Sequence, residues 1–551
     1  MKKSIPGPAR ICINILITLA AAAIYFYIAL PPINIQSGDF WTFVILILLL
    51  FSVLTLLSSK SSQQTPSTPR GLFHFLWKNI RIPMILIGLC LVFCLIGTIL
   101  SAVIFNTKAY SSLITLQESD FSKDVTEISY DQIPMLDEIS ANTLATRKLG
   151  ELSDLVSQFE VDESSAQINY QNTPVRVTYL NYGDFFKWIN NRDNGIPAYI
   201  VTDMVTQEVS VIRLEEGMKY TPSEPLNRNI NRHLRFKYPF TMFSDVNFEI
   251  DEDGTPYWVA SVMKKTIGLF GGTDITGAVL VNAVTGESQY YEAGGIPSWV
   301  DRVYNAPLII EQYDYYGEYN NGFWNSIFGQ KGCTATTVGY NYIAQDDDVW
   351  VYTGITSVGG DESNIGFILV NQRTKEARYY SVAGAEEYSA MSSAEGSVQQ
   401  FSYNATFPLL LNIEGQPTYF MALKDDSNLV KMYAMVNVQQ YQIVSNGASL
   451  AECEENYYEL LRKNKIIDND QKAPVTEDKT EHVAGMITEL RTAVIEGTTY
   501  YYIKLDADEN VWFRISAAES EEIVLYNVND EIALSYEKTE VPSIQPAKIE
   551  Y

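Results

Sequence analysis

Histidine and cysteine are scarce in this chain of 551 residues, which contains three histidines and five cysteines. His74, His233 and His482 lie far apart, and no HExxH, CxxC, GxSxG or Walker phosphate-loop motif is present. Zinc hydrolysis and Ser-His-Asp catalysis both require a histidine beside specific partners. We therefore expect a protein that is not an enzyme, with no catalytic residue, no cofactor and no metal site.

The cysteine pattern excludes a disulfide scaffold. Cys12, Cys90 and Cys94 fall within apolar segments, so only Cys333 and Cys453 could pair outside them. One bridge at most across 446 residues is too few for a small disulfide-stabilised secreted protein. Such sparse use of cysteine is typical of a bacterial envelope protein.

Basic residues are also few, with 39 Lys and Arg against 66 Asp and Glu and a net charge of -27. Residues 1–105 hold seven Lys and Arg and a single Asp, which leaves residues 106–551 with a net charge of -33. An acidic surface repels the phosphate backbone, so we expect no nucleic-acid partner.

Three uncharged apolar segments occur near the N-terminus, at about 11–30, 41–57 and 82–105. Each has the length that a helix needs to cross the hydrocarbon core of a bilayer. Residues 1–105 are therefore predicted to form three transmembrane helices with a loop at 58–81. No small-residue cleavage site follows the first segment, so we expect it to be retained.

Basic residues flank these segments on one side of the predicted membrane. They lie before the first segment and between the second and third, at Lys2, Lys3, Arg10, Lys60, Arg70, Lys78 and Arg81. The positive-inside rule places the N-terminus and the loop at 58–81 in the cytoplasm. We expect a multi-pass plasma-membrane protein whose residues 106–551 are extracytoplasmic.

One pattern recurs in the exterior region, at 198–214, 277–293 and 366–382. The three segments align without gaps and share Thr206, Thr285 and Thr374 as well as Glu208, Glu287 and Glu376. A weaker fourth copy lies at 432–444. Each copy reads as a strand, a polar turn and a second strand, so the pattern predicts repeated β-hairpins.

The order of helical and strand patterns predicts an α+β fold made of repeated helix-plus-antiparallel-sheet modules. Helices are expected near 133–159, 183–191, 224–236, 298–304 and 450–463. The predicted divisions are a connector and helix at 106–165, modules at 166–243, 244–332 and 333–403, a partial module at 404–464, a linker at 465–482, a small OB-like or SH3-like β-barrel at 483–538 and a tail at 539–551.

The turn L-V-N-A-V-T-G-E at 280–287 is similar to the closing hairpin of PepSY-type domains, which reads V-D-A-x-T-G-E. The helix-then-sheet order resembles the same family. Asp203 fits the pattern, whereas Asn282 and Asn371 depart from it. The resemblance implies exported or membrane-tethered modules that restrain peptidases or bind proteins and have no catalytic residues.

The segment 311–332 is unusually rich in aromatic residues and glycine and is predicted to be a long structured loop. Aromatic side chains in such a loop could stack on sugar rings or receive a peptide, and packing between two domains is the alternative. The candidate binding residues are Tyr313, Tyr315, Tyr316, Tyr319, Phe323 and Trp324.

Two short motifs have simpler explanations than a site. Ser261 and Lys264 match S-x-x-K, but they lie in a strand pattern, where residues i and i+3 point to opposite faces. The acidic run at 506–510 begins like an EF-hand loop, yet Ala517 stands where that loop needs glutamate.

These observations predict a non-enzymatic, membrane-anchored bacterial envelope protein whose exterior region binds, scaffolds or restrains another envelope protein. The alternative is a receptor for an extracellular ligand such as a cell-wall glycan, although the predicted cytoplasmic parts are too short for a signalling domain. A hydrolase that uses only carboxylates also stays open, because 65 exterior acidic residues cannot be sorted by sequence alone.

Overall fold

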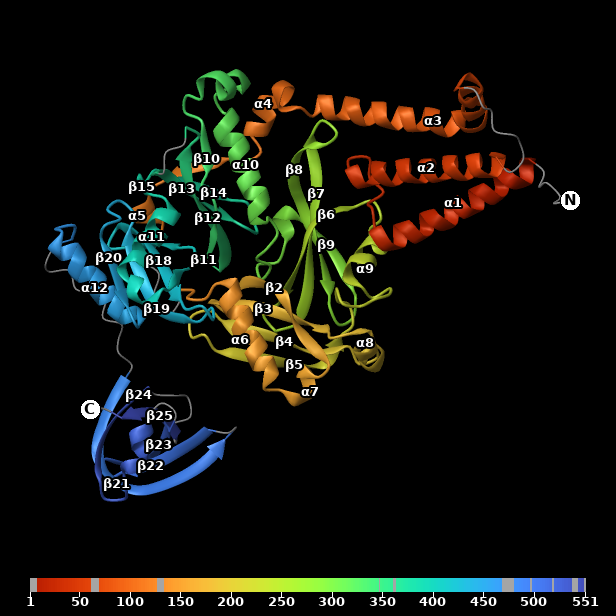
Figure 1. The fold of residues 1–551 in the computed structure, drawn as a ribbon. Coiled ribbons are helices and arrows are strands. Elements are labelled where there is room, and N and C mark those ends of the chain that lie inside the picture. Colours follow the sequence, from red (N-terminus) through yellow and green to blue (C-terminus); the bar gives the residue numbers. More distant parts are fainter. Residues whose placement is uncertain are drawn as a thin grey trace. The chain divides into compact units, whose positions relative to one another are not determined.

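The computed structural model describes residues 7–60, 69–125, 133–345, 347–359, 363–467, 480–495, 498–517, 520–537 and 544–549. The chain forms two compact units, residues 1–464 and 465–551, which we describe separately. Helices and antiparallel sheets are both abundant (Figure 1), which confirms the α+β class.

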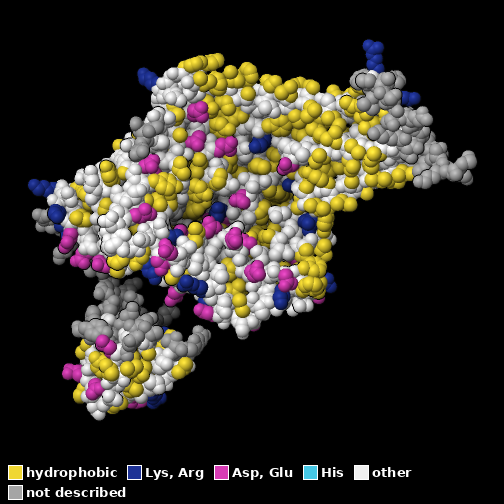
Figure 2. All heavy atoms as spheres, viewed as in Figure 1, with side chains coloured by type: hydrophobic (Ala, Val, Ile, Leu, Met, Phe, Trp, Pro, Cys, Tyr) yellow, Lys and Arg dark blue, Asp and Glu magenta, His cyan; other side chains and the backbone are white. Residues whose placement is uncertain are grey.

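Three helices near the N-terminus are long and apolar enough to cross a membrane. They are α1 (Gly7–Ala29), α2 (Gly38–Lys60) and α3 (Pro69–Leu100). Apolar side chains cover these helices, whereas acidic side chains gather over the sheets (Figure 2). The chain turns after Leu100 into a short separate helix, α4 (Val103–Ser111), so the third apolar helix ends before the predicted boundary at 105.

The first unit contains four sheets, each built around an antiparallel meander, and one edge strand of the third sheet pairs in parallel. The first sheet is β2 (Phe159–Tyr170), β3 (Thr173–Tyr182), β4 (Ile196–Asp203) and β5 (Val209–Met218), and the second is β6 (Met242–Ile250), β7 (Pro256–Ile267), β8 (Gly271–Asn282) and β9 (Ser288–Glu292). The third is β10 (Thr334–Thr336), β11 (Asn341–Gln345), β12 (Asp348–Ser357), β13 (Ser363–Asn371) and β14 (Ala377–Tyr380), joined by β1 (Leu116–Ser119) and β15 (Gly384–Ala385). The fourth is β16 (Asn404–Ala405), β17 (Leu409–Ile413), β18 (Gln416–Lys424), β19 (Val430–Asn437) and β20 (Val444–Gly447).

A helix precedes each sheet, namely α6 (Glu138–Gly150), α9 (Ile230–Lys237), α10 (Ala306–Tyr319) and α11 (Glu387–Ser397). Before each helix, a short segment contacts the next sheet along the chain. A backbone N–H group of this segment donates to a carbonyl group in the turn before the last strand of that sheet. The donor and acceptor pairs are Met135 N and Met204 O, Tyr220 N and Ala283 O, Tyr304 N and Gln372 O, and Ala385 N and Val438 O. Each helix is therefore tied to the sheet that comes after it, and from here on a module means one such helix with its sheet: α6 with the first, α9 with the second, α10 with the third and α11 with the fourth. Strand β2 runs across the predicted division between 165 and 166.

The remaining helices are short or terminal: α5 (Phe121–Asp124), α7 (Ser153–Val156), α8 (Phe185–Asn191) and α12 (Leu450–Lys463). The helix predicted at 133–159 is divided into α6 and α7, and β2 has begun by Phe159. The helix predicted at 298–304 is not formed. Helix α10 begins later, after Asn305, whose side chain caps it, and Pro307 lies in its first turn.

The repeated segments form hairpins with the same turn. The Oδ1 atom of Asp203, Asn282 or Asn371 accepts hydrogen bonds from the backbone N–H groups two and three residues later. The residue before the glutamate has a positive φ in all three turns, at Gln207, Gly286 and Lys375. This Asx-turn needs one side-chain acceptor, which Asp and Asn both supply.

The four sheets pack in succession and close a ring. One face of the second sheet, with Trp258 and Val279, packs on the first sheet, and its other face, with Val259 and Leu280, packs on α10 and the third sheet. Phe367 of the third sheet meets Tyr419 of the fourth edge-on at 6.1 Å. The fourth sheet returns to the first module, where Lys424 Nζ lies 2.5 Å from Asp137 Oδ2 and Ser140 Oγ donates to Asn428 O.

The ends of the apolar helices bind the second module directly. Arg235 Nε of α9 donates to Leu30 O at the end of α1, and Gln36 Nε2 before α2 donates to Lys265 O of β7. Ser101 Oγ after α3 accepts from the backbone N–H groups of Leu269 and Phe270. The C-terminal ends of α1 and α3 and the N-terminal end of α2 therefore face the sheets.

The second unit contains β21 (Thr480–Ile495), β22 (Thr498–Leu505), β23 (Asp508–Ser516), β24 (Glu531–Glu537) and β25 (Ile544–Ile549). They pair in the closed order β21-β22-β23-β25-β24 around a core that includes Ile487, Phe513 and Leu534. This confirms a small barrel-like β unit. Residues 544–549, predicted as part of a tail, form a strand because β25 bridges β23 and β24.

Candidate functional site

A cavity of about 560 Å³ lies between the four sheets. Its wall includes Ser165 of the first sheet, Asn247 of the second, Tyr342 of the third and Phe420 of the fourth. Sheets placed around a shared central cavity resemble the blades of a β-propeller. Because every sheet supplies part of the wall, the cavity requires the closed ring.

The first strand of each sheet is irregular where it borders this cavity. The pairing of β2 with β3 shifts between Val161 and Ser165, and that of β6 with β7 shifts between Phe243 and Val246. In the third and fourth sheets the first strand is split into β10 and β11 and into β16 and β17. Extra residues in an edge strand re-aim side chains and are common beside binding sites. Their recurrence at one place in four sheets makes the cavity the candidate site.

Arg176 of β3 lines the cavity with only 6% of its surface exposed. Its Nη1 donates to Ser165 Oγ at 3.2 Å and to Ser165 O at 3.4 Å. Among the described residues, the one carboxylate oxygen within 4.0 Å is Glu138 Oε1, at 3.9 Å, and Nε has no hydrogen-bond partner. A buried guanidinium is costly unless a close counter-charge pairs with it. The positive charge of Arg176 is therefore incompletely compensated.

Arg302 reaches the same cavity from the segment before α10 and is half-buried. Its Nη2 donates to Tyr342 OH at 3.5 Å, and its guanidinium carbon lies 5.5 Å from the centre of that ring. Within the described ranges, no carboxylate oxygen lies within 4.0 Å of this guanidinium. Burial lowers the pKa of Arg176, Glu138 opposes this shift, and the charge of Arg302 adds to it. Burial lowers the pKa of Arg302, but Tyr342, Asp245, Glu249 and Glu138 outweigh this effect and raise it. Two cations thus face one cavity, and Arg176 is the less compensated of the two, so an anion would stabilise Arg176 in particular.

The rest of the lining combines aromatic and polar residues with aliphatic ones such as Met135, Leu136 and Met204. It includes Tyr179, Phe248, Tyr340, Phe407, Asn341, Ser164, Asp137, Glu138 and Asp245. Asp137 is already engaged, because it pairs with Lys424 and caps α6 through Ser140 N. Aromatic surfaces beside amides and arginines suit an organic ligand with an anionic group better than a bare ion.

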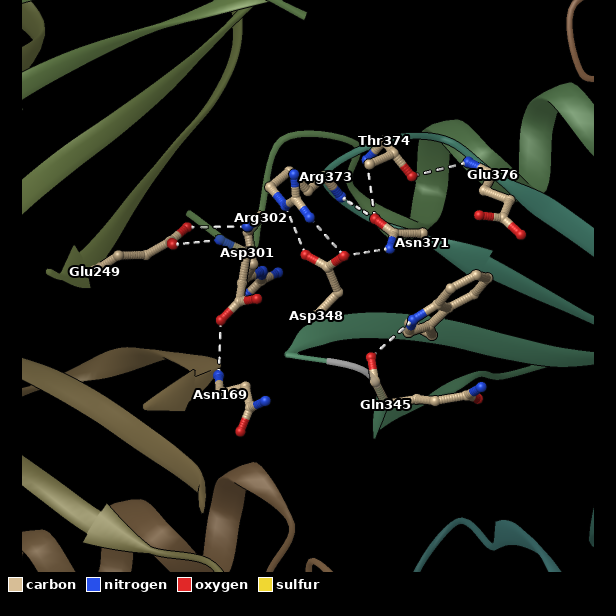
Figure 3. Close-up of polar contacts among 11 residues, drawn as sticks. Asn169, Glu249, Asp301, Arg302, Gln345, Asp348, Asn371, Arg373, Thr374 and Glu376 are labelled. Atoms are coloured by element: carbon tan, nitrogen blue, oxygen red, sulfur yellow. Dashed lines mark hydrogen bonds and ion pairs between the residues drawn. The ribbon is translucent and has the colours of Figure 1, made fainter. Parts of the chain in front are cut away.

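A buried carboxyl pair holds the backbone of Arg302 in place (Figure 3). Glu249 of β6 is fully buried and accepts from Asp301 N at 2.8 Å and from Arg302 N at 3.1 Å. Asp301, also buried, accepts from Asn169 N at 2.7 Å. Burial raises the pKa of Glu249 to about 7, and burial followed by the charge of Glu249 raises the pKa of Asp301. Glu249 is therefore a positioning residue for Arg302.

The predicted aromatic residues lie outside the central cavity, and the segment 311–332, predicted to be a long loop, is largely helical. Residues 306–319 form α10, and a π-helix (Asn325–Gly329) follows it. Tyr313 and Tyr316 are three residues apart, the spacing that places side chains on one face of a helix. The glycine content of the segment favours a loop instead, which is why the sequence did not predict the helix.

The structure places these six residues in two groups. Tyr313 is buried, and Tyr316 packs beside it. The other four form a continuous row of ring contacts, in which Tyr315 stacks on Tyr319, Tyr319 on Phe323, and Phe323 meets Trp324 edge-on. The ring centre of Tyr315 also lies 4.7 Å from that of Tyr110 in α4, and Trp324 is 64% exposed. None of the six lines the central cavity.

The other sequence features have structural explanations. Ser261 lies in β7, where its hydroxyl donates to Val303 O, and Asp506 lies in the turn between β22 and β23. Cys333 and Cys453 are both buried free thiols. In the part of the chain that the structure describes, no group of three His, Cys, Asp or Glu residues is placed to hold a metal ion.

Sequence reasoning missed both cavity arginines. Arg176 lies in the run P-V-R-V-T-Y, where strand alternation would put it on a solvent face. Strand β3 is buried on both faces, because β6 of the second sheet and helices α6 and α8 pack against it. Arg302 lies in a segment without regular structure, and no local pattern marks it.

Comparison with known proteins identifies no relative. No family model and no curated protein matches this chain. Among solved structures, a levansucrase mutant from B. megaterium aligns over 80% of this chain and 97% of its own, with 9% identity and a TM-score of 0.16. A TM-score this low carries no argument about fold or activity.

Proposed function

We propose that this protein is a membrane-anchored extracytoplasmic binding protein whose central cavity holds an organic ligand with an anionic group. A carboxylated or phosphorylated sugar, as found in cell-wall glycans, has this chemistry. The observation that carries the proposal is Arg176, a buried and incompletely paired cation in the wall of an aromatic and polar cavity. Arginine binds carboxylate and phosphate groups through paired hydrogen bonds.

The proposed location is the plasma membrane, with the N-terminus in the cytoplasm and residues 106–551 outside. Two observations support this arrangement. The helix ends that bind the second module all lie on one side, and Arg10, Lys78 and Arg81 lie toward the other ends of their helices. The positive-inside rule assigns the basic side to the cytoplasm.

We propose binding without catalysis. Hydrolysis of a glycan by carboxylates alone needs two acidic groups that are free to act as acid and base or nucleophile. In the cavity, Asp137 is paired with Lys424, and Glu138 accepts from Ser165 N and lies near Arg176. These contacts favour a structural role for Asp137 and Glu138, two of the three cavity acids, and the third, Asp245, accepts from Val246 N.

The proposal is tested by thermal unfolding of the full-length protein in detergent with sugar acids, sugar phosphates and the uncharged parent sugars. An anionic ligand at one hundred times its Kd stabilises the folded state by about 2.7 kcal/mol, which is a measurable rise in Tm. Arg176→Met is expected to abolish this rise, and Arg302→Gln, at a half-buried position, to reduce it. Equal responses to charged and uncharged sugars, or no loss in either variant, would contradict the proposal.

Binding of another envelope protein is a second proposal, with its own supporting observation. Trp324, Ile327 and Phe328 are 64%, 51% and 79% exposed on the π-helix after α10. Exposed aromatic residues close together are typical of protein interfaces. The repeated hairpins agree with the PepSY-like, protein-binding role that the resemblance implies.

The second proposal is tested by quantitative mass spectrometry of proteins that co-purify with the tagged chain from native membranes. A near-equimolar partner should be lost when Trp324 and Phe328 are both replaced by alanine, and Arg302→Gln should retain it. If the alanine variant still retains the partner, Trp324 and Phe328 do not form the surface that binds it.

A further inference from the structure

A second cavity of about 550 Å³ lies between the end of α1 and the central cavity. Its wall includes Ala29 and Leu30 at the C-terminal end of α1. It shares Tyr179, Asp245 and Val246 with the central cavity. The two cavities therefore adjoin, and together they extend from the end of an apolar helix to the cavity arginines.

The lining of the second cavity is largely apolar. Eight of its thirteen lining residues are apolar, Pro222, Ile230, Leu234, Phe243 and Trp258 among them, whereas Asn231, Arg235, Ser244 and Asp245 are polar or charged. Arg235, which is 8% exposed, is its cationic member and donates to three backbone carbonyl groups, those of Leu30, Tyr238 and Thr241. An apolar passage with buried cations at its inner end suits an amphiphile with an anionic headgroup.

Exposed apolar side chains surround this end of the molecule. Phe236 and Phe240 are 55% and 65% exposed, beside the second cavity. The ring of Phe236 lies 5.7 Å from that of Phe26 in α1, and Arg232 lies over the ring of Tyr27 at 4.1 Å. Aromatic and basic residues at the end of a membrane helix are typical of the interface between lipid and water. The second cavity is therefore at the level where lipid headgroups lie.

We infer that the anionic group held in the central cavity belongs to the phosphate headgroup of a membrane lipid, admitted through the second cavity. This inference rests on the proposed function, because it names the source of the ligand in the same site. The chemistry is shared with a free phosphate ester. The apolar lining beside α1 favours the lipid, since a soluble anion gains nothing from an apolar passage that begins at the membrane surface.

The test uses the full chain in nanodiscs of phosphatidylcholine with a minor fraction of phosphatidylglycerol. Lipids that remain bound after transfer to detergent are quantified by mass spectrometry, and binding of soluble glycerol phosphate is followed in parallel by thermal shift. Asn231→Trp places a large ring at an exposed position in the lining of the second cavity. Lys237→Trp, at an exposed position of the same helix outside that lining, is the matched control.

We expect the native chain and Lys237→Trp to retain phosphatidylglycerol over phosphatidylcholine by about tenfold, which corresponds to 1.4 kcal/mol. Asn231→Trp should lose this enrichment and still respond to glycerol phosphate. Arg302→Gln should weaken both responses. Retained enrichment in Asn231→Trp would overturn the inference.

The two proposals fail in different ways. If glycerol phosphate stabilises the native chain but phosphatidylglycerol is not enriched, the binding function stands and the lipid source is wrong. If neither compound binds to the native chain, the anion site itself is wrong.

Discussion

At the residue scale, Asn282 and Asn371 occupy the same turn position but have different surroundings. Each Oδ1 atom accepts from two backbone N–H groups. The amide nitrogen of Asn371 also donates to Asp348 Oδ2 at 2.8 Å (Figure 3), and Arg373 binds both oxygens of the same carboxylate. The contact with Asp348 thus requires the amide of asparagine at 371. At 282 the turn requires only a side-chain acceptor, which Asp and Asn both supply.

Replacement of each asparagine by aspartate tests this difference. Asn282→Asp keeps the acceptor, and we expect a change in unfolding free energy within about 0.5 kcal/mol. Asn371→Asp places a carboxylate beside buried Asp348, and we expect a loss of about 2 kcal/mol. Thermal unfolding of the two variants in the same detergent makes the comparison. Equal losses would show that the contact with Asp348 is not significant.

Glu249 makes stability depend on pH, since burial raises its pKa to about 7 from a usual value of 4.5. Between these values the folded protein keeps a proton that the unfolded chain releases. The free energy of unfolding therefore falls as pH rises from about 4.5 to 7, by an amount on the order of 3 kcal/mol. Asp301 contributes with the same sign, because its pKa is also raised.

Glu249→Gln should flatten the decrease of Tm between pH 5 and pH 7, because glutamine does not titrate. Glu292→Gln, at an exposed position on β9, is the matched control and should follow the native curve. If the Tm of Glu249→Gln falls with pH as steeply as that of the native protein, groups other than Glu249 cause the pH dependence.

At the scale of elements, Arg235 joins α9 to the end of α1. Leu30 has a φ of +51° after the last turn of α1, and its carbonyl accepts from Arg235 Nε at 2.9 Å. Burial lowers the pKa of Arg235 to about 10, with Asp39 opposing the shift, so the side chain is charged at neutral pH. A cation at a helix C-terminus satisfies free carbonyl groups and the helix dipole.

Arg235→Met should loosen the junction between α1 and α2. We expect a loss of about 2 kcal/mol, because three carbonyl groups lose their donor, and faster hydrogen exchange in residues 30–37, because one of these groups is that of Leu30. Lys237→Met, an exposed change on the same helix, should leave exchange unchanged. If hydrogen exchange in residues 30–37 of Arg235→Met is as slow as in the native protein, contacts other than those of Arg235 hold this junction.

Local patterns were enough to predict the apolar helices and the hairpins, because their signals lie within about twenty residues. Helix α10 was missed, since glycine and aromatic content obscured the start signal at Asn305 and Pro307. The cavity arginines could not be predicted, because Arg176 and Arg302 are 126 positions apart and meet only through the packing of sheets.

At the scale of the first unit, the second module connects the membrane helices to the central cavity. Strand β6 carries Asn247 and Phe248 in the cavity wall and Glu249 behind Arg302. Its partner β7 leads into the turn at Leu269 and Phe270, which binds Ser101 after α3. The cavity wall and the helix ends are therefore joined by one hairpin, β6 and β7, and the turn that follows it.

The proposed topology is tested by labelling intact cells with a membrane-impermeant thiol reagent. The native cysteines provide a low background, because Cys333 and Cys453 are buried and burial raises the pKa of the Cys453 thiol to about 12. The other three lie in the apolar helices. Ser427→Cys introduces an exposed thiol in the turn between β18 and β19 of the fourth sheet, and Lys78→Cys introduces one at the N-terminal end of the apolar span of α3, Phe75–Leu100.

Ser427→Cys should react in intact cells, whereas Lys78→Cys should react only after the membrane is permeabilised. This contrast is expected because the sheets lie at the ends of α1 and α3 that are opposite to Arg10, Lys78 and Arg81. The reverse pattern would place the sheets in the cytoplasm. An anionic glycan or outer-leaflet lipid would then be excluded as the ligand, because neither would reach the central cavity.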